Sequence, residues 1–141
     1  MATLGRHLIL EMWDCSSDII NNTEGIKEIL AETANVIKAT VIDIMCHHFS
    51  PYGVTGVAIL AESHISIHTW PEYKYVAADI FLCGNAINPQ VAASYLIQAF
   101  RAKETSIAEF KRGDVLSRQI QDCRTSIPII EDRESRTPAF L

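Results

Sequence analysis

Two neighbouring stretches, residues 64–69 and 75–83, alternate in side-chain character, and this pattern constrains the fold more than any other feature. In the first stretch His64, Ser66 and His68 fall on one face, and Ile65, Ile67 and Thr69 fall on the other. In the second, Val76, Ala78, Ile80 and Leu82 share a face, and Ala77, Asp79, Phe81 and Cys83 share the opposite one. A period of two residues is typical of a β-strand. Because Pro71 lacks the N–H donor that a ladder needs, it is expected to end the first strand.

The rest of the chain supplies four more strands and two helices. Further strands are expected at residues 7–12, 40–49, 56–61 and 105–110. One helix is expected over residues 24–38, capped by Asn22 or Thr23, and another from Asn88-Pro89 to about residue 103. The order β-α-β-β-β-β-α-β predicts an α+β two-layer sandwich, a mostly antiparallel sheet with both helices on one face. The bare face then needs a cover, and pairing of two sheets in a dimer is the simplest.

Composition narrows the class of protein. A chain of 141 residues is the usual size of one domain. The net charge of −5 argues against a nucleic-acid partner and weakly favours a small cationic substrate. The N-terminus has no signal-peptide pattern, and no apolar run approaches the roughly 20 residues that span a bilayer. With four scattered cysteines, Cys15, Cys46, Cys83 and Cys123, the chain is expected to be a soluble cytoplasmic protein with free thiols.

Residues 114–141 differ from the preceding single domain, residues 1–113. Acidic residues and arginines are mixed there with Ser, Thr and Pro, and no periodicity remains. This composition predicts a flexible or loosely docked tail. The apolar run at residues 127–130 leaves docking on a partner as the alternative.

Histidine spacing was considered as a metal motif. His64 and His68 have the i, i+4 spacing of a helical zinc pair, but on a strand they lie about 13 Å apart. Two ligands of one zinc lie within about 4 Å of each other. His47 and His48 point to opposite faces of their strand. No bound metal is predicted.

Residues 61–72 concentrate carboxylates, hydroxyls and imidazoles in one short run, with Glu62-Ser63 at its start. A serine between an acid and a histidine suggests a nucleophile. Ser63 and His68, however, lie about 16 Å apart along a strand. They could meet only if the chain bends between them, or they act at separate moments. Taken alone, Ser63 is better explained as a strand-corner residue that is hydrogen-bonded to the backbone than as a nucleophile.

The run from Glu62 to Glu72 resembles the core motif of the short prokaryotic S-adenosylmethionine decarboxylases. Pro-Tyr-Gly-Val-Thr-Gly at residues 51–56 and Phe-Leu-Cys-Gly at residues 81–84 add to the resemblance, which extends from about Gly5 to Gly113. The family implies that the Glu62–Ser63 bond cleaves itself into a beta chain, 1–62, and an alpha chain, 63–141. It also implies that Ser63 becomes a pyruvoyl group, which forms a Schiff base with the substrate amine.

The resemblance assigns roles to five other residues. His68 is implied as the proton acceptor in processing, and Thr55 assists the cut, where many relatives have Ser. Cys83 is implied as the proton donor in decarboxylation. Phe49 is implied as a platform for adenine and Glu72 as an acceptor for the ribose hydroxyls; Tyr52, Trp70 and Tyr73 remain open as the second stacking residue.

The implied function is decarboxylation of S-adenosylmethionine, which supplies the aminopropyl donor for spermidine synthesis. The implied assembly is a homodimer of cleaved protomers, with two alpha and two beta chains. Two alternatives stay open at this stage. One is a pyruvoyl-dependent decarboxylase of another amino acid, such as arginine or ornithine, and the other is a non-catalytic dimeric ligand-binding module.

Overall fold

A single six-stranded sheet organises the computed structural model, which describes residues 3–116. The strands are β1 Thr3–Trp13, β2 Val41–His48, β3 Val54–Leu60, β4 Ser63–Trp70, β5 Tyr75–Cys83 and β6 Glu104–Asp114. The helices are α1 Ser17–Ile20, α2 Thr23–Val36 and α3 Pro89–Ala99, with a short 3-10 turn, η1, at Pro71–Tyr73. The predicted tail lies almost wholly outside the described residues.

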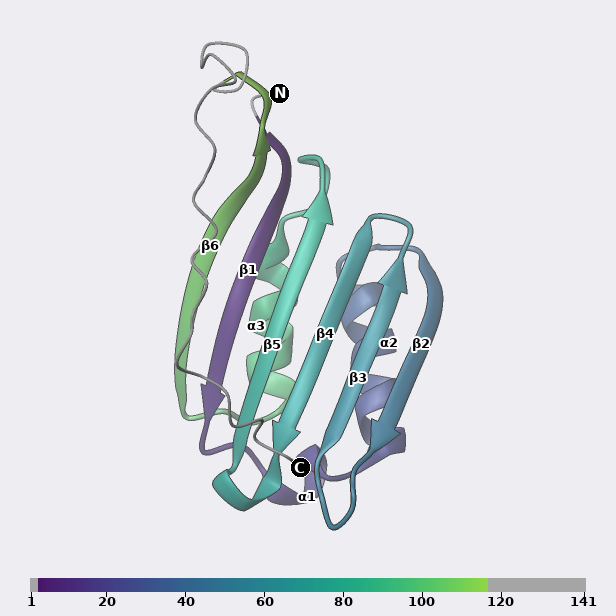
Figure 1. The fold of residues 1–141 in the computed structure, drawn as a ribbon, viewed down its shortest axis with the longest axis vertical. Helices are drawn as coiled ribbons and strands as arrows, with labels where there is room; N and C mark the ends of the chain where they lie inside the picture. The colour runs from purple at the N-terminus through teal and green to yellow at the C-terminus, as the bar shows by residue number, and fades with distance from the viewer. Residues whose placement is uncertain (1–2, 117–141) are drawn as a thin grey trace, which may run out of the picture.

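The strands lie in the order β2-β3-β4-β5-β1-β6, and every neighbouring pair is antiparallel (Figure 1). Strands β2 to β5 follow one another as a meander. Strand β1 then inserts beside β5, and β6 pairs with its outer side. The strand that begins at Ser63 therefore lies in the middle of the sheet, held by ladders on both sides.

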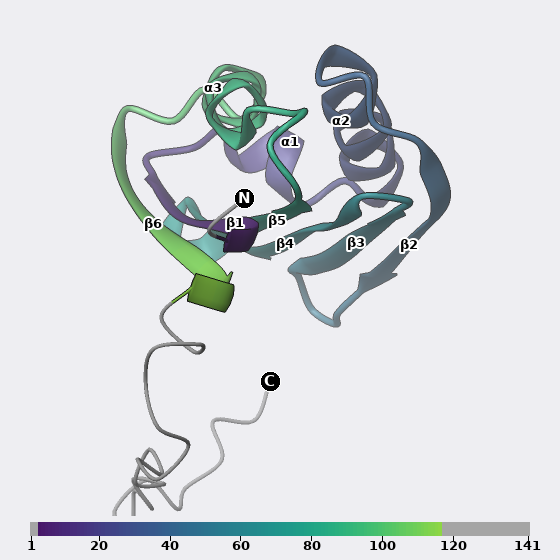
Figure 2. The ribbon, with the colours of Figure 1, turned by 90° about the horizontal axis from the view of Figure 1, so that it is seen from above.

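Helices α2 and α3 lie side by side over one face of the sheet (Figure 2). The core forms between them and the sheet, where Leu8 and Leu10 of β1, Ile65 of β4, Leu30 of α2 and Leu96 of α3 are fully buried. Both predicted helix starts are confirmed: the side chain of Asn22 caps α2, and that of Asn88 caps α3 ahead of Pro89. The predicted two-layer α+β sandwich is confirmed as well.

The structure corrects the boundaries of several predicted elements. Helix α3 ends at Ala99, not near residue 103, and Arg101 has a positive φ of 54° that turns the chain toward β6. Strands β1 and β6 are longer than predicted because they pair with each other from Thr3 to Trp13. The short helix α1 was not predicted, since four residues carry too little periodicity to be recognised.

The opposite face of the sheet, here called the open face, is not covered by any element within residues 3–116 (Figure 2). Its side chains are the alternate residues whose neighbours enter the core. They include a polar cluster and several partly exposed apolar residues: Ile9, Trp13, Met45, Ile59 and Phe110.

Among the described helices, none has the length and apolar character needed to cross a bilayer.

Candidate active site

The backbone is strained where β4 begins. Ala61 and Glu62 form the tight turn between β3 and β4, and Ser63 has a φ of +139°. A residue with a Cβ rarely adopts such a conformation, which costs on the order of 1–3 kcal/mol. The turn is tied to the residue before β2, because the Thr40 N–H donates to both carboxylate oxygens of Glu62, at 3.1 and 3.3 Å. The surrounding sheet thus maintains the strain at Ser63.

Cys83, at the end of β5, lies against the same turn. Its backbone N–H donates a 2.8 Å hydrogen bond to the carbonyl oxygen of Glu62, the oxygen of the Glu62–Ser63 peptide. A donor at this position would stabilise negative charge that develops on the oxygen when the carbonyl carbon is attacked. The side chain of Cys83 is exposed. Antiparallel pairing of β4 with β5 therefore brings Glu62, Ser63 and Cys83, here called the turn group, together.

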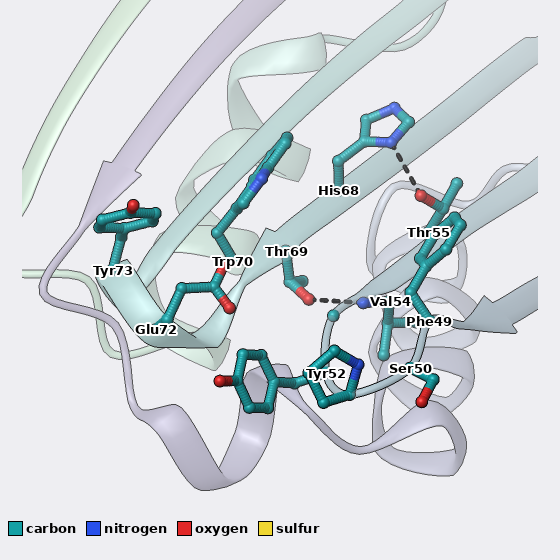
Figure 3. Close-up of a pocket in the computed structure, with 12 residues that line it drawn as sticks. Phe49, Ser50, Tyr52, Val54, Thr55, His68, Thr69, Trp70, Glu72 and Tyr73 are labelled. Carbon is teal, nitrogen blue, oxygen red and sulfur yellow. Dashed lines mark hydrogen bonds between the residues drawn. The ribbon is translucent and has the colours of Figure 1, made fainter. Parts of the chain in front are cut away.

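A pocket of about 370 Å³ opens at the other end of β4. Figure 3 shows the side chains that line it, which come from the β2–β3 loop, from the ends of β3 and β4, and from η1. Four of them were predicted site residues, here called the pocket group: Phe49, Thr55, His68 and Glu72. Tyr52, Trp70 and Tyr73 also line it, so this aromatic pocket contains all three candidates for a second stacking residue.

Thr55 and His68 pair across β3 and β4, and their side chains point toward one another (Figure 3). The hydroxyl of Thr55 and Nδ1 of His68 are hydrogen-bonded at 3.0 Å. The contact orients the imidazole, because one ring nitrogen is occupied by the hydroxyl. The other ring nitrogen has no hydrogen bond to a described residue that would compete for a proton.

Trp70 is supported from behind by an aromatic stack on the open face. The ring centroids of Trp70 and Tyr75 lie 5.3 Å apart, and those of Tyr75 and Trp13 lie 4.3 Å apart. The Tyr75 hydroxyl donates to the carboxylate of Glu11 at 2.7 Å. Burial and this carboxylate raise the pKa of Tyr75 to about 12. The hydroxyl therefore stays protonated at neutral pH and keeps the wall of the aromatic pocket in place.

The turn group and the pocket group lie at opposite ends of β4. The strand runs unbroken from Ser63 to Trp70, so the chain does not bend between Ser63 and His68. Five residues of strand separate them, about 16 Å. Within one protomer, Ser63 and His68 are therefore too far apart to exchange a proton.

A cluster of polar side chains lies on the open face between the two groups. One carboxylate oxygen of Asp79 accepts from Nε2 of His7 at 2.7 Å and from Nε2 of His64 at 2.8 Å. The other oxygen accepts from the Ser66 hydroxyl, and Arg112 donates to Nδ1 of His7 at 2.8 Å. Sequence reasoning missed this cluster as a unit, because the strand register that joins β1, β4, β5 and β6 is not visible in any local pattern.

The ligand atoms of His7, His64 and Asp79 lie within 4.8 Å of one another, close enough to consider a metal ion. Hydrogen bonding favours a different description. Because the Arg112 guanidinium has only donors, Nδ1 of His7 must accept its hydrogen bond. Nε2 of His7 therefore carries the ring N–H and donates it in the hydrogen bond to Asp79. A protonated nitrogen has no lone pair for a metal. The three residues are thus accounted for as a hydrogen-bonded network.

These features define a class of protein: a small antiparallel α+β sandwich with a strained turn at one end of its central strand and an aromatic pocket at the other. The family model for S-adenosylmethionine decarboxylase matches residues 6–113 of the chain. The match includes every residue of the turn group and of the pocket group.

Individual relatives agree with the family model. The S-adenosylmethionine decarboxylase proenzyme of Thermodesulfovibrio yellowstonii is 46% identical over 118 residues, 84% of this chain and 87% of the relative. That of Methanococcus aeolicus is 47% identical over 116 residues, 82% of this chain and 99% of the relative. The crystal structure of the adenosylmethionine decarboxylase from Aquifex aeolicus VF5 superimposes with a TM-score of 0.74 at 34% identity, covering 80% of this chain and 93% of that one. The chain belongs to the S-adenosylmethionine decarboxylase family, and the resemblance inferred from its motifs is confirmed.

Proposed function

We propose that the chain is a proenzyme that cleaves itself between Glu62 and Ser63 and then decarboxylates S-adenosylmethionine. The observation that carries the proposal is the strained backbone at Ser63, which coincides with the serine that the family motif marks for cleavage. The strain raises the free energy of the intact chain, so it lowers the barrier to cleavage by the part that is relieved in the transition state.

The cleavage uses only groups of the chain. The Ser63 hydroxyl oxygen attacks the Glu62 carbonyl carbon, and the peptide C–N bond breaks to leave an ester and a free amine at residue 63. A base then removes the Cα proton of residue 63, and the bond between Cβ of residue 63 and the ester oxygen breaks, which releases a chain that ends in the carboxylate of Glu62. The dehydroalanine left behind tautomerises, and water replaces its nitrogen, which leaves as ammonia; a pyruvoyl group remains.

One group beside the turn supports this sequence of steps, and a second group, at the far end of β4, is proposed to reach the turn from a partner protomer. The Cys83 N–H already donates to the carbonyl oxygen that becomes negatively charged on attack, at 2.8 Å. An imidazole nitrogen that carries no hydrogen can accept a proton, and this role is proposed for His68. Thr55 assists by holding the imidazole through its hydroxyl.

In the mature enzyme, a pyruvoyl group at residue 63 would accept the electrons that are freed as CO₂ leaves. The chain must then return a proton to the substrate carbon. The exposed thiol of Cys83 is proposed as this donor, since it lies at the end of β5 next to residue 63 and carries an S–H group that can donate a proton. The place of Cys83 beside the turn supports both of its roles.

The aromatic pocket is proposed to hold the nucleoside part of the substrate. Phe49 offers a ring on which adenine stacks, and the exposed carboxylate of Glu72 can accept from the two ribose hydroxyls. No comparable need for aromatic walls exists for arginine or ornithine, so the pocket favours the nucleoside substrate over these alternatives. A non-catalytic module is disfavoured by relatives that are named decarboxylase proenzymes.

We propose a homodimer in which the open faces of two protomers pack against each other. Partly exposed apolar side chains on this face need a cover, and a second sheet supplies one. A two-fold arrangement with opposed strands places the turn group of one protomer against the pocket group of its partner. The 16 Å separation within one chain supports this pairing, because the proposed chemistry needs Ser63 and His68 within hydrogen-bond reach.

The free thiols of Cys15, Cys46 and Cys83 fit the cytoplasm as the compartment.

Denaturing mass spectrometry of the purified protein tests the proposal directly. We expect two chains, residues 1–62 and 63–141, and a longer chain that lacks a free amine at its start. Decarboxylation is then measured as release of CO₂ from the carboxyl-labelled substrate. A single intact chain without decarboxylation would overturn the assignment.

A further inference from the structure

The short helix α1 has no motif in the sequence and no role in the steps above, yet it touches both halves of the aromatic pocket. It contacts η1, which carries Glu72 and Tyr73. The residue at its C-terminal end, Asn21, reaches across to the β2–β3 loop. The side-chain oxygen of Asn21 accepts from the Gly53 N–H at 3.0 Å and from Nε2 of His48 at 3.1 Å. One amide oxygen therefore holds the two ends of residues 48–53 together.

This loop has few other restraints. Residues 50–52 are exposed, and Gly53 has a φ of +108°, a conformation that suits glycine. Within the loop, one backbone hydrogen bond joins the Phe49 N–H to the Gly53 carbonyl at 2.8 Å. Phe49 and Tyr52, two rings of the aromatic pocket, are thus placed by a loop that depends on an outside anchor.

A second, buried contact ties the same end of α1 to the strands that carry Thr55 and His68. The Thr69 hydroxyl donates to the carbonyl of Ile20 at 2.7 Å and accepts from the Val54 N–H at 2.9 Å. Figure 3 shows the second of these contacts at the base of the pocket. Because Ile20 is fully buried, α1 is a fixed support for Asn21.

We propose that Asn21 is a positioning residue for nucleoside recognition: it clamps the loop that carries Phe49 and so sets the affinity of the aromatic pocket without taking part in cleavage. The inference deepens the proposed function and rests on it, because it assumes that the pocket receives the nucleoside. It does not involve the turn group, which lies at the other end of β4.

The test compares three variants of the full chain. Asn21→Ala removes the acceptor and both hydrogen bonds. Asn21→Asp keeps a side-chain oxygen in the same place and is the rescue variant. Asn22→Ala is the matched control, because it is the same change one residue away and removes the N-cap of α2, where Asn22 accepts from the Gly25 N–H at 3.1 Å. The control thus loses stability without touching the loop.

For Asn21→Ala we expect a KM about five to ten times that of the parent, from the loss of two neutral hydrogen bonds, with kcat and the extent of cleavage unchanged. Binding of methylthioadenosine, which has the adenine and ribose but no amino acid, should weaken by the same factor in calorimetry. Asn21→Asp should restore both values, and Asn22→Ala should lower the melting temperature and leave KM unchanged.

If Asn21→Ala has the same KM and the same nucleoside affinity as the parent, the proposed role of Asn21 as a clamp is overturned. It is also overturned by an Asn22→Ala variant that raises KM as much, since the effect would then follow stability alone. If the parent neither cleaves nor decarboxylates, the proposed function fails instead, and the clamp is judged by nucleoside binding.

Discussion

The two ends of β4 are built in different ways. At the Ser63 end the important groups belong largely to the backbone: a φ of +139°, the carbonyl of Glu62 and the N–H of Cys83. At the His68 end they are side chains, which converge from a loop, two strands and a 3-10 turn. In the proposed function, the first end supplies the bond that the chain cleaves in itself, and the second end binds a separate molecule.

This difference predicts how each end responds to substitution. Backbone groups remain when a side chain is changed. A substitution in the turn group should therefore stop a chemical step only where it removes the reacting atom itself. Within the pocket group, Phe49 and Glu72 should lose affinity gradually, since each side chain supplies a part of the binding energy, whereas loss of His68 should stop cleavage.

Ser63→Ala removes the attacking oxygen and should abolish cleavage, because the strained turn alone has no nucleophile. Denaturing mass spectrometry should show one intact chain. Ser94→Ala, on the exposed side of α3, is the matched control and should cleave as the parent does. Cleavage of the Ser63→Ala chain at the same bond would contradict the assignment of the nucleophile.

Mixing two inactive variants should restore cleavage if the two ends meet across a dimer. A dimer of one Ser63→Ala chain and one His68→Ala chain contains one complete site. The His68→Ala chain supplies Ser63 to this site, and the Ser63→Ala chain supplies His68. With random pairing of co-expressed chains, about half of the His68→Ala chains should become cut. Mass spectrometry identifies which chain is cut, and no rescue at all would show that each protomer works alone.

Cys83→Ala should separate the two chemical steps. The backbone N–H that donates to the Glu62 carbonyl remains, so the chain should still cleave. Decarboxylation should fall by about 10²-fold or more without the thiol proton donor, and the enzyme should inactivate during turnover. Cys46→Ala, on β2, is the control. Turnover of Cys83→Ala at the parent rate would assign Cys83 a structural role.

Glu72→Gln probes the pocket end, where the expected loss is gradual. The amide accepts hydrogen bonds from the ribose hydroxyls less strongly than a carboxylate, so KM should rise about tenfold while cleavage proceeds normally. Glu28→Gln, an exposed position on α2, is the control. Impaired cleavage in Glu72→Gln would show that the two ends are not separable.

The smallest effect is expected outside both ends, at the pair formed by Arg6 and Glu109. Their side chains approach to 2.5 Å between Nε and Oε1, and this hydrogen bond lowers the pKa of Glu109. A carboxyl group with a lowered folded-state pKa adds stability above its unfolded pKa, and this stability is lost as pH falls through the folded value. Because the pair is about 30% exposed, Glu109→Gln should cost no more than about 0.5–1 kcal/mol at pH 7. Urea unfolding should show this difference at pH 7 and its loss as the pH is lowered through the folded-state pKa of Glu109. A difference that stays the same as the pH is lowered would indicate packing and not charge.

Local patterns determined a large part of the fold. Alternation in residues 75–83 predicted the bounds of β5, and the Asn-Pro pair at residues 88–89 predicted the start of α3. These succeed because alternation and capping are properties of consecutive residues. Helix α1 escaped prediction, since its position depends on Ile20 entering a core formed by distant segments.

The features of the candidate site also separate into those carried by consecutive residues and those that depend on the tertiary structure. The family could be recognised from the sequence, and the dipeptide Glu62-Ser63 could be singled out as the proposed cleavage site, because both belong to one contiguous motif. Only the tertiary structure decided that Ser63 is strained, that the Cys83 N–H faces the Glu62 carbonyl, and that His68 lies at the far end of the strand. It also decided that His7, Asp79 and Arg112 form one network, and that Asn21 holds the pocket loop. The physical reason is that strand register and loop packing join residues far apart in the chain, and no local pattern of side chains records which of them will be neighbours.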